Sequence, residues 1–94
     1  MELSKMVIKI PFDILGRNAH RLVYKLQEVK SSIRFTIDGR SIDAKSLLGL
    51  LSAQIKEGDE IEVACYNDIS QFAANDLCTT VMLIREVAVM DDGV

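Results

Sequence analysis

Four side chains in this sequence could form a binding or modification site: the hydroxyl of Ser46, the guanidinium of Arg17, the ammonium of Lys45 and the imidazole of His20. Ser46 comes seven residues after an Asp-Gly pair and directly before the leucine-rich run 47–51. A serine at the start of a helix can cap the helix or accept a phosphate.

The hydroxyl of Ser46 has two interpretations. As a helix N-cap, it accepts a hydrogen bond from an amide two or three residues later, which contributes about 1 kcal/mol. As a target of a dedicated kinase, it acquires a phosphate that adds about −1.5 to −2 charge at pH 7. The open amides and the dipole at a helix N-terminus would stabilise that charge.

Four leucines follow Ser46 within five positions. They surround a short helix too completely for all of them to be buried against one sheet, although a leucine on such a helix is usually in the core. We expect Leu50 to be buried. We expect Leu47, Leu48 and Leu51 to form an exposed apolar patch, a feature that commonly marks a partner site.

Arg17 and His20 lie near the start of a second predicted helix, which begins at Gly16. At a helix N-terminus the Arg17 guanidinium and nearby amides can hold an anion, with Lys45 as a second cation; the alternative is a solvated arginine. His20, three residues later, can share a helix surface with Arg17. It lies beyond the open amides of the first turn, so we expect a surface histidine that can contact a partner rather than a phosphate acceptor.

Composition limits the class of protein. Residues 1–94 are enough for a single small domain, and an apolar content of 49% is ordinary for a folded globule. The net charge is −3 and the basic residues are scattered, which argues against direct nucleic-acid binding. No apolar run approaches the roughly 18 residues of a membrane span, and the N-terminus does not resemble a secretory signal. We therefore expect a cytoplasmic protein without a membrane association.

Two cysteines, Cys65 and Cys78, fall in apolar-patterned segments. Without a secretory signal, we expect two reduced thiols in or near the core rather than a disulfide. One histidine and two separated cysteines cannot build a zinc site, so the sequence predicts no metal and no cofactor.

Hydrophobic periodicity predicts the elements that position these residues. A first strand alternates through 6–10 and is ended by Pro11. A helix from Gly16 buries one face, and a strand over 32–37 points its odd-numbered residues inward. Asp38-Gly39 is a preferred pair for a two-residue hairpin turn, followed by a short return strand at 40–42. The helix face consists of Ala19, Leu22, Val23, Leu26 and Val29.

The second half of the chain is predicted to contain the Ser46 helix, a loop at 56–59, a strand and a final helix. Ile61, Val63 and Cys65 should point inward from the strand. Asn67 or Asp68 can cap the final helix, which we expect to continue to about Glu86. Its predicted buried stripe is Ile69, Phe72, Ala73, Leu77, Thr80 and Ile84.

The resulting order, β-α-β-β-α-β-α, predicts the α+β class. Four antiparallel strands would form an open-faced β-sandwich, with the three helices on one face of the sheet.

This order and several short motifs resemble the HPr family, the histidine-containing phosphocarriers of the bacterial sugar phosphotransferase system. The likeness covers roughly residues 3–84. It is strongest in the run 45–52, which reads Lys-Ser-Leu-Leu-Gly-Leu-Leu-Ser where the family reads Lys-Ser-Ile-Met-Gly-Val-Met-Ser. Arg17, Ala19, the Asp38-Gly39 turn and Gly58 add to it. The resemblance implies a single HPr-like domain and a docking face formed by the Ser46 helix and the start of the first helix.

The active-site motif of the family, Gly-Leu-His-Ala-Arg-Pro, is only partly kept. The matching stretch 13–18 reads Asp-Ile-Leu-Gly-Arg-Asn. Leu15 stands where the resemblance places the phosphorylated histidine, Arg17 is retained, and Asn18 replaces the proline. Because leucine has no nucleophilic atom, phosphoryl transfer through position 15 is chemically impossible. The chain is therefore similar to regulatory relatives such as the catabolite-repression HPr, which lack the histidine and keep the serine.

The resemblance implies a regulatory protein that is not an enzyme and that can be phosphorylated at Ser46. The partners implied are an HPr kinase/phosphorylase or phosphotransferase-system proteins, and a catabolite-control transcription factor. Two alternatives stay open: a phosphocarrier that uses His20, and an interaction module on the same fold that is never phosphorylated.

Overall fold

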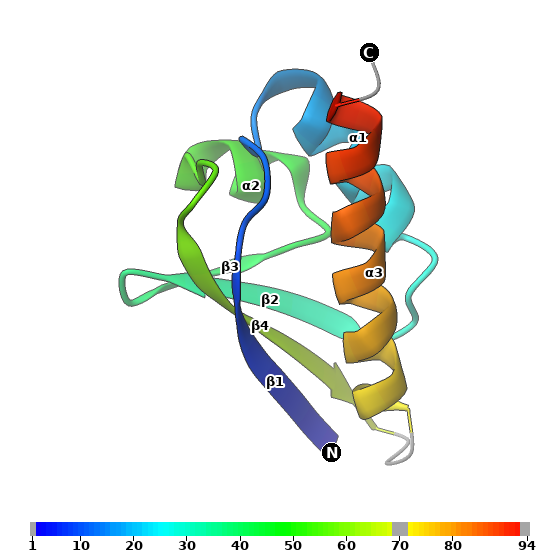
Figure 1. Cartoon of the computed structure of the whole chain (residues 1–94). Coiled ribbons are helices and arrows are strands. Elements are labelled where there is room, and N and C mark those ends of the chain that lie inside the picture. Colours follow the sequence, from blue (N-terminus) through cyan, green and yellow to red (C-terminus); the bar gives the residue numbers. More distant parts are fainter. Residues whose placement is uncertain (1, 69–71, 93–94) are drawn as a thin grey trace.

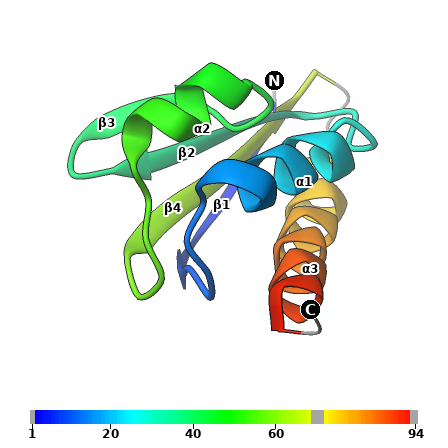
Figure 2. The same cartoon turned by 90° about the horizontal axis from the view of Figure 1, so that it is seen from above.

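Four strands form one antiparallel sheet with the order β1-β4-β2-β3 in this computed structural model, which describes residues 2–68 and 72–92. The strands are β1 (Glu2–Lys9), β2 (Ser32–Ile37), β3 (Arg40–Asp43) and β4 (Glu60–Asn67). The helices are α1 (Gly16–Leu26), α2 (Leu47–Ala53) and α3 (Ala73–Asp92). Figures 1 and 2 show the helices gathered on one side of the sheet. The predicted fold class and element order are confirmed.

Alternating side chains explain why the sheet is covered on one face. Ile33, Phe35 and Ile37 of β2 are buried, while the residues between them are exposed or half-buried. Ile61 and Val63 of β4 point to the same side and are buried. These side chains meet the buried stripe of α1 in the core, so the strand periodicity was predicted correctly.

The hairpin between β2 and β3 has the turn that the sequence predicted. Asp38 has a φ of 50° and Gly39 a φ of 79°, values of the left-handed region that Asp-Gly turns favour. The turn places Arg40 opposite Ile37 and starts the strand that leads to α2.

The start of α3 differs from the prediction. The helix begins at Ala73; Asn67 is the last residue of β4, and Asp68 follows it outside any helix. Phe72, predicted to be buried in the helix, precedes it and is 48% exposed. Ile69 lies outside the described residues. Ala73, Leu77, Thr80 and Ile84 are buried as predicted.

The end of α3 also lies beyond the predicted boundary. The helix continues past Glu86 to Asp92, although several of its last residues are β-branched. Val87 is fully buried, and Leu83 and Ile84 join the same core. This packing outweighs the small helix-propensity cost of β-branched residues. The extra turns carry the end of α3 to the start of α1, as Figure 1 shows.

The two cysteines are both free, and their environments differ. Cys65 is buried in β4, and its sulfur lies 3.6 Å from the Thr80 hydroxyl oxygen. Cys78 is exposed, so the expectation that both thiols lie in or near the core was wrong for this residue. Its position on α3 is one residue past buried Leu77, on the solvent side of the helix.

Candidate functional site

The segment that leads into the N-terminal end of α1 is hydrogen-bonded to the loop that follows α2. Segments 10–14 and 55–59 exchange backbone hydrogen bonds, including Ile14 N–H to the Ile55 carbonyl at 2.9 Å. The Glu57 amide donates to Asp13 Oδ1 at 2.8 Å. These bonds tie the approach to α1 to the exit from α2. The two helices that the resemblance assigns to a docking face are thus connected at this end.

Leu15 occupies the N-cap position of α1. Its backbone is extended, its carbonyl accepts from the Ala19 amide at 3.4 Å, and its side chain is 41% exposed. Gly16 then turns the chain into the helix with a φ of 51°, a conformation that costs a residue with a Cβ about 1 kcal/mol. The end of α1 therefore presents an apolar side chain instead of a capping oxygen.

A polar hollow of about 370 Å³ lies beside this end of α1 and is called the basic hollow below. Arg17, Asn18, Arg21 and Asp91 line it. Asn18 Nδ2 donates to Asp91 Oδ1 at 3.0 Å and lies 3.4 Å from the Asp13 carbonyl oxygen. The sequence identified Arg17, but it gave no sign that Asp91, 73 positions after Asn18, would lie here.

Ser46 caps α2 in the structure. Its backbone is extended, and its hydroxyl accepts from the Gly49 amide at 3.1 Å. Asp43 arranges the turn before the cap: its carbonyl accepts from the Ser46 amide at 3.0 Å, and its carboxylate accepts from the Lys45 amide at 2.9 Å. The capping interpretation of Ser46 is therefore confirmed in geometry.

Lys45 was expected to help hold an anion, but its ammonium contacts the backbone. It donates to the Val29 carbonyl in the loop after α1. The side chain thus links α2 to the loop between α1 and β2. An anion at the start of α2 would have to compete with this contact for the Lys45 charge.

The leucines of α2 separate into two groups. Leu50 is fully buried, as predicted, while Leu48 is 80% exposed. Leu47 and Leu51 are half-buried and pack against the core while keeping an accessible side. We call Leu47, Leu48 and Leu51 the leucine patch, in which Leu48 provides the most prominent apolar side chain.

His20 is exposed in the second turn of α1. It lies five positions after the N-cap residue Leu15, which corresponds to about 7.5 Å along the helix axis. A phosphate on this imidazole would therefore lie well away from the open amides of the first turn.

A partly buried polar cluster that sequence reasoning missed joins β4, α3 and the loop before β2. Ser31 is 1% exposed; its hydroxyl donates to the Asp76 carboxylate and accepts from Asn67 Nδ2 at 3.0 Å. Its amide also donates to Asp76, at 3.1 Å. These polar groups satisfy one another, so the cluster orients α3 on the sheet. Burial also raises the pKa of the nearby Cys65 thiol, against a smaller opposing effect of the Thr80 hydrogen bond.

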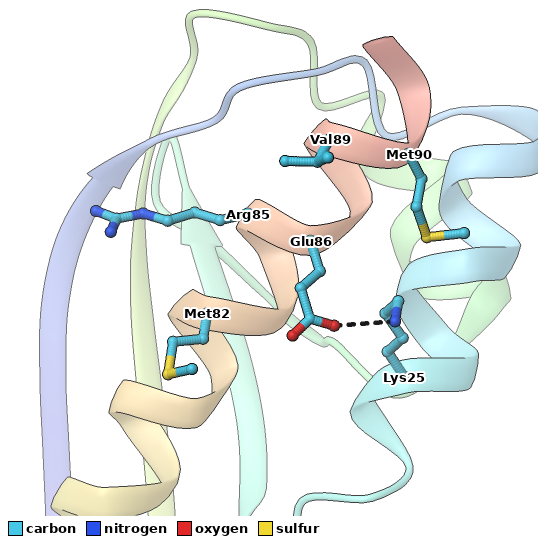
Figure 3. Close-up of a pocket in the computed structure, with 6 residues that line it drawn as sticks. All are labelled: Lys25, Met82, Arg85, Glu86, Val89 and Met90. Carbon is cyan, nitrogen blue, oxygen red and sulfur yellow. Dashed lines mark hydrogen bonds and ion pairs between the residues drawn. The ribbon is translucent and has the colours of Figure 1, made fainter. Parts of the chain in front are cut away.

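A second hollow, of about 450 Å³, lies on the outer side of α3 (Figure 3). Its walls are mainly apolar, from Met82, Val89 and Met90. Lys25 of α1 and Glu86 of α3 close one side through an ion pair of 3.1 Å, drawn as a dashed line in Figure 3. This pair and the Asn18–Asp91 bond show that α1 and α3 run in opposite directions.

Two absences hold within residues 2–68 and 72–92. No helix there has the length and apolar character needed to cross a membrane. No group of three or more histidine, cysteine, aspartate or glutamate side chains in the same ranges is arranged to hold a metal ion.

Comparison with known proteins identifies the family of this open-faced sandwich. Residues 4–82 match the family described as the PTS HPr component phosphorylation site. The match covers most of the chain, so the protein belongs to the HPr family, the phosphocarriers of the phosphotransferase system.

A named relative and two solved structures agree with this family. The phosphocarrier protein HPr of Borreliella burgdorferi is 26% identical over 86 residues, which cover 92% of this chain and all of the relative. The phosphocarrier protein HPr of Bacillus anthracis is 19% identical, with a TM-score of 0.75 over 86% of this chain and 95% of that one. Crh, the catabolite repression protein of Bacillus subtilis, is 22% identical, with a TM-score of 0.63 over 76% and 78%. The two structures support the HPr fold.

Proposed function

We propose that this protein is a cytoplasmic, non-catalytic regulator of the HPr family that lacks the carrier histidine and acts through protein partners, with Ser46 as its phosphorylation site. The observation that carries the proposal is the geometry of α2. Ser46 caps a short helix whose next residues include Leu48, 80% exposed. A modification and a contact surface are thus adjacent on one element.

The start of α2 is suited to a phosphate for electrostatic reasons. The first amides of a helix have no partner within the helix, and its N-terminal dipole favours negative charge. The Gly49 amide, which now donates to the Ser46 hydroxyl, could donate to a phosphate oxygen instead. Phosphorylation would then change the charge of the docking surface without requiring α2 to unfold.

The proposed loss of the carrier reaction follows from position 15. Leu15 occupies the N-cap of α1, which the family motif assigns to the phosphorylated histidine. A hydrocarbon side chain cannot accept a phosphoryl group. Arg17 is kept and lines the basic hollow, where we assign it to acidic or phosphorylated groups of a partner.

The proposed docking face combines the leucine patch with Arg17 and His20 of α1. Such a face would offer apolar side chains together with the positive charge of Arg17, which suits a partner that presents apolar side chains and an acidic rim. Lys45 is a weaker member, because its ammonium already contacts Val29. By family likeness, the partners are an HPr kinase/phosphorylase, other phosphotransferase-system proteins and a catabolite-control transcription factor.

The modification is tested by incubating the protein with ATP and an HPr kinase/phosphorylase and measuring the intact mass. We expect one added phosphate on the native protein and none on Ser46→Ala. Ser52→Ala is the matched control, because Ser52 lies on the same helix and is exposed. Absence of phosphate on the native protein, or equal phosphorylation of Ser46→Ala, would contradict the proposal.

A docking module that is never phosphorylated is the second candidate, and the surroundings of Ser46 favour it in one respect. The Asp43 carboxylate already occupies the turn before the cap, so a phosphate there would meet a like charge. In this case Leu48→Asp should abolish partner binding, while Ser46→Asp should leave it unchanged. An equal loss of partner binding in both variants would instead favour regulation by phosphorylation of Ser46.

A further inference from the structure

The outer face of α3 carries exposed apolar side chains along one line of the helix. Met82 is 60% exposed and Val89 is 71% exposed, and both line the hollow of about 450 Å³ shown in Figure 3. They lie seven residues apart, nearly two helical turns, so they project in almost the same direction. The core is closed on the other side of α3 by Leu83, Ile84 and Val87. Met82 and Val89 are therefore free to contact another molecule.

Two opposite charges flank this apolar line. At 3.6 residues per turn, Arg85 lies about 50° to one side of the line and Glu86 about 50° to the other. Figure 3 shows Arg85 pointing toward β1, whose residues line a hollow with it, while Glu86 points toward Lys25 of α1. Within the described part of the chain, Arg85 takes part in no hydrogen bond or ion pair. The Glu86 carboxylate has two oxygens, so it can accept a second cation besides Lys25.

We propose that this face of α3 binds the same face of a second copy of the chain, with the two α3 helices parallel. A two-fold axis that runs along the helices exchanges their two flanks. Each Arg85 then lies opposite the partner's Glu86, while Met82 and Val89 pack against their counterparts. The contact is independent of the site proposed at Ser46, which lies on α2.

The charge pattern excludes the antiparallel alternative. A two-fold axis across the helices reverses their direction but keeps each flank on its own side. Arg85 would then face Arg85, and Glu86 would face Glu86, so like charges would meet on both flanks. Only the parallel pair combines apolar contact with opposite charges.

The contact should be weak and reversible. A single pair of helices is small beside the roughly 1,600 Å² of a standard protein interface, and the flanking ion pairs are exposed. We therefore expect a dimer that dissociates on dilution. High salt should weaken it further, because salt screens exposed charges.

Exchange of the two charges tests the pairing, with sedimentation velocity of the full chain over a range of concentrations. Arg85→Glu alone and Glu86→Arg alone should each lower the dimer affinity roughly tenfold, because like charges then meet on both flanks. An equimolar mixture of these two variants should recover the native affinity, because opposite charges meet again. Arg34→Glu is the matched control: Arg34 is exposed on β2, on the face of the sheet away from the helices, and its change should leave the affinity unaltered.

Cys78 reports the orientation of the two helices. It is exposed and lies one helical turn before Met82, while Cys65 is buried. In the parallel pair the two Cys78 thiols lie at the same height, so a short bismaleimide should join them. In an antiparallel pair centred on Arg85 and Glu86 they would lie more than about 20 Å apart along the axis.

The control for collision is Ser52→Cys in a Cys78→Ala background, which moves the exposed thiol to α2 and should give little crosslinked product. Equal crosslinking at the two positions would overturn the proposal. So would a dimer whose affinity is unaffected by the charge variants, or a mixture that fails to recover it. A chain that stays monomeric at millimolar concentration would mean that the face binds a different partner or none, which also rules the proposal out.

Discussion

The side chain at position 15 limits the chemistry of the α1 end, because leucine has no atom that can accept a phosphoryl group. The remaining polar groups there, Arg17 and Asn18, offer hydrogen-bond donors for the anion binding that we propose, but they cannot form a covalent intermediate. At the start of α2 the situation is reversed. Ser46 has an oxygen that can be phosphorylated and already contacts a helix amide. Single residues therefore place the proposed chemistry on α2 and leave binding to α1.

The N-cap at Ser46 leads to a prediction about the stability of the protein. Ser46→Ala removes the acceptor of the Gly49 amide, so we expect the free energy of unfolding to fall by about 1 kcal/mol. Urea denaturation followed by circular dichroism measures the change. Ser52→Ala, which removes only an exposed hydroxyl that donates to the Gly49 carbonyl, should cost less. Equal losses in the two variants would show that the cap contributes nothing specific.

Cys65 gives a prediction about pH. Burial raises the pKa of its thiol in the folded protein. As the pH rises past the ordinary thiol value of about 8.5, the unfolded chain loses this proton first, and the free energy of unfolding falls until the pH exceeds the folded pKa. At pH values below the ordinary thiol pKa, the contribution of the protonated Cys65 thiol to the free energy of unfolding is fully present. Urea denaturation at neutral pH and at about pH 9.5, one unit above that value, measures the loss.

Variants identify the thiol responsible for this loss. Cys65→Ala lowers stability at every pH by emptying a buried site, but its decline at high pH should be smaller than that of the native protein. Cys78→Ala, which changes an exposed residue, should keep the native decline. A native decline in Cys65→Ala would mean that other groups cause it.

At the scale of elements, the short helix α2 has two sides with different roles. Leu50 is fully buried, so Leu50→Ala should lower the free energy of unfolding by about 2–5 kcal/mol. Leu48 is 80% exposed, and Leu48→Asp should change it by less than about 0.5 kcal/mol while weakening partner binding about tenfold or more. Thermal unfolding and a binding titration measure the two effects. A stable Leu48→Asp variant with native partner affinity would exclude the leucine patch as a contact.

Sequence periodicity predicted β2, β4, α1 and α2 because each of these elements buries one face, although Val29, included in the predicted face of α1, lies beyond the end of that helix. The hairpin was predictable because Asp38 and Gly39 both tolerate the left-handed backbone. The limits of α3 were not predictable in this way. Its end depends on the burial of Val87 against the core. A tertiary contact therefore decided the C-terminal boundary.

The site was only partly predictable for the same reason. Ser46, Arg17 and the alternation of buried and exposed leucines could be derived from local pattern. The Asn18–Asp91 contact joins residues 73 positions apart and depends on how far α3 extends. The engagement of Lys45 with Val29 likewise depends on how α2 packs beside α1. The local sequence pattern does not reveal either of these tertiary contacts.

At the scale of the whole molecule, the proposed functional groups belong to the helices that cover one face of the sheet. The bonds between segments 10–14 and 55–59 link the start of α1 to the loop after α2, and α3 lies on the other side of α1 (Figure 2). A charge added at Ser46 would therefore act on a preformed surface. The central claim is that phosphorylation of Ser46 regulates this surface, and that the protein does not carry a phosphoryl group on a histidine.

Phosphorylation from two alternative donors tests this claim most directly. The native protein, Ser46→Ala and His20→Ala are each incubated either with ATP and an HPr kinase/phosphorylase or with phosphoenolpyruvate and enzyme I. Intact mass is then measured before and after acid treatment. We predict an acid-stable phosphate in the reaction with ATP and the kinase, and none in the reaction with phosphoenolpyruvate. This phosphate should be absent in Ser46→Ala and present in His20→Ala. An acid-labile phosphate from phosphoenolpyruvate that His20→Ala removes would contradict the account.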